Sequence, residues 1–61
     1  MLSLSEIRAR FDLLPEDQRQ TIEEMAKSNR VLDAIKETRR VLDFSIPDAD
    51  YVVNVILLKK N

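Results

Sequence analysis

The side chains that could do chemistry in this sequence are carboxylates, hydroxyls and a cluster of cations, because the chain has no His and no Cys. Asp48 and Asp50 are the nearest pair of possible metal ligands, but residues two apart on a helix point to different faces. Acids in the first turn of a helix are stabilised by the helix dipole. We therefore expect Asp48 and Asp50 to support a helix start and to bind no metal.

Catalytic carboxylates and nucleophiles have equally little support in the sequence. Acid–base catalysis needs a desolvated pocket that perturbs a pKa, and a chain of 61 residues has little interior with which to build one. Serine catalysis needs a base such as His, which is absent. We expect no enzyme activity and no cofactor. The carboxylates and hydroxyls considered for these roles are Glu23, Glu24, Asp33, Glu37, Ser3, Ser5, Ser28 and Ser45.

The densest cluster of cations lies between residues 30 and 40 and is the main candidate for binding. It could contact an acidic protein surface or a phosphate backbone, although the interleaved Asp33 and Glu37 also suit a solvated helix face. The net charge of −1 lacks the basic excess typical of a nucleic-acid binder, so a protein partner is our preferred hypothesis and nucleic acid the alternative. The predicted partner-binding residues are Arg30, Ile35, Lys36, Arg39 and Arg40.

Short helices with polar caps must position these side chains. Ser3 and Glu6 match a capping box, which predicts a first helix over residues 4–13. Pro15 ends this helix and opens the next one, because proline disfavours helical conformation at the preceding residue but suits the first helical position. The first two helices are therefore joined by a very short connection.

The middle of the chain has one apolar stripe that continues across a possible break. Ser28 and Asn29 are good capping residues, yet no Gly or Pro forces a stop there. A single helix over residues 15–42 and two helices separated at Ser28-Asn29 both fit the pattern, and we favour the break. The apolar residues that we expect to be buried here are Ile22, Met25, Ala26, Val31, Leu32, Ile35, Val41 and Leu42.

The last element runs from Pro47 to about Lys60. Its β-branched residues make a strand the alternative, but the proline and the acidic Asp48 favour a helix start. Only Asn54 is polar between residues 51 and 58. Because a helix that is apolar all round must be covered all round, we expect another chain to cover part of it, with a central core helix as the alternative. The predicted oligomer interface consists of Tyr51, Val52, Val55, Ile56 and Leu58.

Residues 32–53 resemble a known two-helix motif. The two parts of the motif read IKETRRV from Ile35 and FSIPDAD from Phe44, and Val53 follows. With these residues the segment is similar to the C-terminal domain of the ribosomal stalk protein L7/L12. The resemblance implies two helices joined by a tight turn and a basic face that docks translational GTPases.

The same resemblance implies particular placements. Ile35 would face Val53 across the helix pair, and the small Ala49 would let the second helix approach closely. The turn that the family builds with glycines falls here on Asp43 and Ser45. A turn of the same shape requires a positive φ without glycine, at a cost of about 1 kcal/mol.

Length and composition limit the remaining choices. The chain is short enough for one domain only, residues 1–61, and the absence of Gly excludes phosphate-binding loops and dinucleotide fingerprints. No stretch reaches the roughly 18 apolar residues of a transmembrane helix, and the N-terminus lacks the pattern of a signal peptide. We therefore expect a cytoplasmic protein without membrane contact.

These observations combine into one prediction for fold and function. We expect an all-α protein, a compact bundle of three or four short helices that forms a homo-oligomer through its apolar C-terminal helix. Its expected role is that of a non-enzymatic protein–protein interaction module, an inhibitor or regulator of a protein partner. Phages and mobile elements often encode small chains with such roles. The alternatives are a dimeric nucleic-acid-associated regulator and an L7/L12-like docking module for a translation factor.

Overall fold

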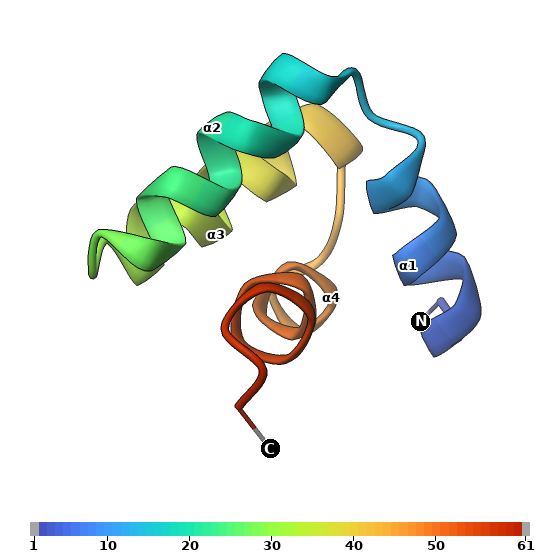
Figure 1. Ribbon diagram of the computed structural model, residues 1–61. Coiled ribbons are helices and arrows are strands. Elements are labelled where there is room, and N and C mark those ends of the chain that lie inside the picture. Colours follow the sequence, from blue (N-terminus) through green and yellow to red (C-terminus); the bar gives the residue numbers. More distant parts are fainter. Residues whose placement is uncertain (1, 61) are drawn as a thin grey trace.

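The computed structural model describes residues 2–60 and contains helices as the only regular elements in that range (Figure 1). Between residues 2 and 60, none of the helices combines the length and apolar character needed to cross a membrane. The prediction of a small all-α bundle is therefore confirmed. The elements in chain order are α1 (Leu4–Asp12), α2 (Glu16–Lys27), α3 (Val31–Leu42), α4 (Ile46–Tyr51) and the π-helix η1 (Val52–Leu57).

The bundle has three parts, which are the α2–α3 hairpin, the α4–η1 segment and α1. The helices α2 and α3 lie side by side as a hairpin, whereas α4 and η1 are seen end-on between this hairpin and α1 (Figure 1). The π-helix η1 contacts α1, α2 and α3, so it lies at the centre of the fold. The Cα radius of gyration of the described chain is 10.1 Å.

Side-chain caps fix the starts of two helices, α1 with the predicted Ser3 cap and α4 with Ser45. The Ser3 hydroxyl accepts a hydrogen bond from the Glu6 N–H, with 3.2 Å between N and Oγ. The Ser45 hydroxyl accepts one from the Asp48 N–H at 3.4 Å. Each bond satisfies a backbone donor that has no partner inside the first turn.

The middle of the chain forms two helices, which confirms the favoured break after Lys27. Asn29 adopts a left-handed conformation with a φ of 64°, a region that Asn tolerates better than most residues. The Arg30 N–H donates to the Met25 carbonyl at 2.9 Å and closes the end of α2.

The α3–α4 turn also uses a left-handed residue without glycine. Asp43 has a φ of 55°, and its N–H donates to the Arg39 carbonyl at 2.9 Å. Ser45 is extended instead, with a φ of −67°. Of the two positions where the resemblance places glycines, Asp43 alone requires a positive φ.

Three alanines lie in the core, and Ala34 marks the side of α3 that is buried. Ala26, Ala34 and Ala49 are at most 2% exposed, and the buried Thr38 donates its hydroxyl hydrogen to the Ala34 carbonyl at 2.8 Å. The predicted burial of Leu32 is wrong, because its side chain is 74% exposed. Leu32 lies about 160° around the helix from Ala34, whose side faces the core.

The C-terminal segment is helical, so the strand alternative is wrong, and η1 ends a few residues earlier than predicted. The Leu58 N–H donates to the Val53 carbonyl at 3.0 Å, the bond from residue i+5 to residue i that defines a π-helix. This wider winding brings positions i, i+1, i+4 and i+5 toward one side. Val52 and Val53 are fully buried there, and Ile56 and Leu57 pack against the same core.

Candidate functional site

The strongest candidate site is the side of α3 that faces away from the core. We define this α3 outer face as Leu32, Ile35, Lys36 and Arg39, whose spacing of i, i+3, i+4 and i+7 places them on one side of a helix. Leu32, Lys36 and Arg39 are exposed, and Ile35 is half-buried against the core. The face therefore presents apolar surface next to two positive charges.

Leu32 is the residue of this face that the sequence pattern assigned to the core. The informative signal was the spacing of Ala34 and Thr38, which lie one turn apart and are both fully buried. Ala34 and Thr38 therefore define the buried side of α3. The remaining apolar residue on the opposite side is Leu32.

Two of the predicted partner-binding residues already have acidic partners. Arg30 pairs with Asp33, with 3.0 Å between Nε and Oδ2, and Arg40 pairs with Glu37, with 3.0 Å between Nε and Oε1. The hydrogen bond from Arg40 lowers the pKa of Glu37, and it raises the pKa of Arg40. Exposed pairs add little stability, but they neutralise part of the cationic cluster.

Lys36 and Arg39 form no ion pair with any residue from 2 to 60. The Arg39 Nε donates to the Phe44 carbonyl at 3.2 Å, which holds this side chain against the α3–α4 turn. Its two terminal nitrogens still carry donors that can bind a carboxylate. The uncompensated positive charge of the predicted cluster is therefore concentrated at these two residues.

The predicted oligomer interface on the C-terminal helix is only partly accessible. Val52 is fully buried within its own chain, so it has no surface left for a partner and is removed from this set. Tyr51, Ile56 and Leu58 are half-buried and pack against the core, and Val55 is also half-buried. The accessible part of the predicted interface is therefore limited to these four half-buried side chains.

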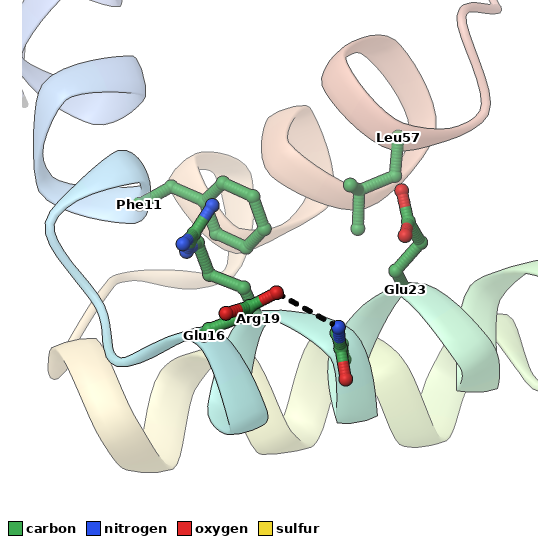
Figure 2. A pocket seen from close by; sticks show the side chains of 6 residues that line it. Phe11, Glu16, Arg19, Glu23 and Leu57 are labelled. Carbon is green, nitrogen blue, oxygen red and sulfur yellow. Dashed lines mark hydrogen bonds between the residues drawn. The ribbon is translucent and has the colours of Figure 1, made fainter.

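A cavity of about 230 Å³ lies where α1, α2 and η1 meet (Figure 2). Figure 2 shows Phe11 and Arg19 at one end and Leu57 and Glu23 at the other. The Arg19 Nε donates to the Leu14 carbonyl at 3.0 Å, so this guanidinium also holds a helix connection. The charges around the cavity are of both signs. Its lining consists of Phe11, Glu16, Arg19, Gln20, Glu23 and Leu57.

The carboxylates of the described chain do not gather into a metal site. Between residues 2 and 60, no three side chains of the His, Cys, Asp and Glu types are placed to hold a metal ion. Asp48 is 5% exposed and Asp50 is exposed, so the two carboxylates lie on different sides of α4.

Comparison with known proteins brings no match to this chain. No protein-family model, no curated protein and no solved structure matches it. The geometry and charge of the α3 outer face are therefore the basis for assigning a function to the chain.

Proposed function

We propose that this chain is a non-enzymatic interaction module that binds a protein partner through the α3 outer face and thereby inhibits or regulates that partner. The observation that carries the proposal is the 74% exposure of Leu32 beside the uncompensated cations Lys36 and Arg39. Exposed apolar surface rimmed by polar residues is typical of protein–protein contact sites.

A protein fits this face better than a nucleic acid does. Binding to phosphates depends on several Lys and Arg side chains that neutralise the backbone charge. Here Arg30 and Arg40 are already paired with acids, and the net charge of the chain is −1. A leucine side chain, by contrast, gains affinity when it enters an apolar pocket of a protein surface.

Capture of the partner from the native host tests the proposal, with the wild-type chain and Leu32→Ser as baits. We expect the wild-type chain to retain a partner and Leu32→Ser to lose it while its circular dichroism spectrum stays helical. Leu13→Ser is the matched control, because Leu13 is 84% exposed but follows α1. Equal capture by Leu32→Ser and Leu13→Ser would contradict the assignment to α3. Translation factors, the partners implied by the L7/L12 resemblance, would be identified in the same experiment.

A homo-oligomer formed through the apolar C-terminal helix, from the end of α4 through η1 to Leu58, is the second part of the proposal. The residues that retain outward surface are Tyr51, Val55, Ile56 and Leu58. Light scattering after size-exclusion chromatography at micromolar concentration measures the state of the chain. We expect Val55→Asp to convert the oligomer into a monomer, and a wild-type chain that is already monomeric would refute this part.

A further inference from the structure

We infer that the partner presents an acidic amphipathic helix, which lies along the α3 outer face and reaches the exposed Ile46 at the start of α4. The inference rests on the proposed function, since it names the class of partner for the same surface. Three observations support it: the uncompensated charge, the position of Ile46 and the poor fit of a second copy of this chain.

The positive charge of the α3 outer face favours a partner with acidic side chains. Neither Lys36 nor Arg39 has an acidic neighbour within ion-pair distance in the part of the chain that the structure describes. Opposite charges across an interface steer association and select the correct partner. Four other cations of the described chain do have acidic partners, namely Arg10, Lys27, Arg30 and Arg40.

Ile46 extends the face beyond the end of α3. Leu32 and Arg39 lie about 10 Å apart along the helix axis. The Arg39 Nε then contacts the Phe44 carbonyl at 3.2 Å, and Ile46 follows two residues later, at most about 7 Å further along the chain. Ile46 is 59% exposed and Leu32 is 74% exposed. Along the chain, the two exposed apolar side chains thus precede and follow the cations Lys36 and Arg39.

A helix is the element that fits this arrangement. An amphipathic helix of about three turns is roughly 16 Å long, enough to extend from Leu32 past Arg39. Such helices bind a neighbouring surface with apolar residues at i, i+3, i+4 and i+7. Acidic residues that flank this apolar stripe would lie near Lys36 and Arg39.

A second copy of this chain is a poor occupant of the face. Closed dimers have two-fold symmetry, so pairing through this face would bring α3 against α3. Lys36 and Arg39 of one copy would then lie near the same cations of the other copy. Because like charges across an interface oppose association, the occupant is a different chain of opposite charge.

A synthetic peptide tests the class of partner directly. The probe is a helix of about 14 residues, held helical by a covalent staple, with leucines at i, i+3, i+4 and i+7 and glutamates beside them. A scrambled peptide of the same composition is its control. In fluorescence anisotropy we expect the amphipathic peptide to bind at least about tenfold more tightly than the scrambled one and to weaken as salt is added.

Variants of the protein locate the contact. Lys36→Glu should weaken peptide binding by about tenfold or more, whereas Arg8→Glu should not. Arg8 is a matched control because it is exposed on α1, has no ion pair with residues 2–60, and gives the same change of net charge. Ile46→Ser should also weaken binding, and Leu13→Ser should not.

Each negative result overturns a defined part of the inference. The inference of an acidic helix as partner is refuted if the peptide does not bind at about 1 mM. It is also refuted if Lys36→Glu and Arg8→Glu bind the peptide equally well. Unchanged binding by Ile46→Ser refutes the extension to α4. If capture of the native partner still depends on Leu32 while the peptide fails, the inference is wrong and the proposed function stands. If Leu32→Ser captures the partner normally, the proposed function itself fails.

Discussion

The helices α3 and η1 differ in which of their apolar residues they bury fully. In η1 Val52 and Val53 are fully buried, whereas α3 buries Ala34 and Thr38 and leaves the larger side chain of Leu32 74% exposed. The π-helix η1 places the adjacent Val52 and Val53 together on its buried side. In α3, burial therefore follows the position of a residue around the helix and not the size of its side chain.

The largest loss of stability is expected from a substitution at a fully buried position of η1. Val53→Asp would place an unpaired carboxylate at a fully buried position, which costs several kcal/mol, comparable with the whole stability of a small domain. Val55→Asp is the matched change on the half-buried side and should leave the chain folded. Circular dichroism at 25 °C compares the two variants. A folded Val53→Asp chain would show that η1 does not pack as described.

The next largest loss of stability is expected from a substitution on the buried side of α3, compared with one on its exposed side. Ala34→Leu adds volume to a fully buried position between closely packed helices and should cost about 1–3 kcal/mol of unfolding free energy. Leu32→Ala removes an exposed side chain and should change that free energy by less than about 0.5 kcal/mol. Urea unfolding measures both. Equal costs would mean that the two sides of α3 are buried to a similar degree.

Local signals in the sequence were sufficient for most of the helical framework. The capping serines Ser3 and Ser45 accept hydrogen bonds from backbone N–H groups, and the break at Ser28-Asn29 follows capping chemistry. These features depend on residues a few positions apart. The π winding of η1 has no comparable local signal in the sequence, and η1 packs against α1, α2 and α3.

The candidate site was predictable in its charged part and not in its apolar part. Lys36 and Arg39 are exposed as expected, because cations on a helix surface seldom become buried. Leu32 was assigned to the core because hydrophobicity alone does not reveal which side of α3 contacts its neighbours. The pairing of Arg30 with Asp33 required side-chain geometry as well.

A smaller effect is expected at the ends of the two helices, where non-glycine residues adopt a positive φ. Asp43 after α3 has a φ of 55°, and Lys59 after η1 has a φ of 57°. Glycine adopts this region without a steric cost. Asp43→Gly and Lys59→Gly should therefore each raise the free energy of unfolding, by about 1 kcal/mol at most. The increase in stability should be larger for Lys59→Gly than for Asp43→Gly, because Asp tolerates the left-handed region better than Lys. Thermal unfolding ranks the two variants, and destabilisation by either would contradict the described turn.

The smallest effect concerns the ion pair of Glu37 and Arg40 at the edge of α3. The hydrogen bond from Arg40 lowers the pKa of Glu37 below its ordinary value of 4.5. A carboxyl group with a lowered folded-state pKa stabilises the fold above the unfolded-state pKa and loses that contribution as the pH falls through the folded-state value. We therefore expect a slight loss of stability below about pH 4.5 that Glu37→Gln removes.

The matched control for this pH dependence is Glu24→Gln. Glu24 is exposed on α2 and forms no ion pair with residues 2–60, so its substitution should leave the acid limb of the stability profile unchanged. An NMR titration that follows the Glu37 carboxyl carbon reports its pKa directly. An ordinary pKa for Glu37 would mean that Arg40 is not held by this acid in solution. Arg40 would then join Lys36 and Arg39 as uncompensated charge, and the cationic surface of α3 would be broader than the α3 outer face.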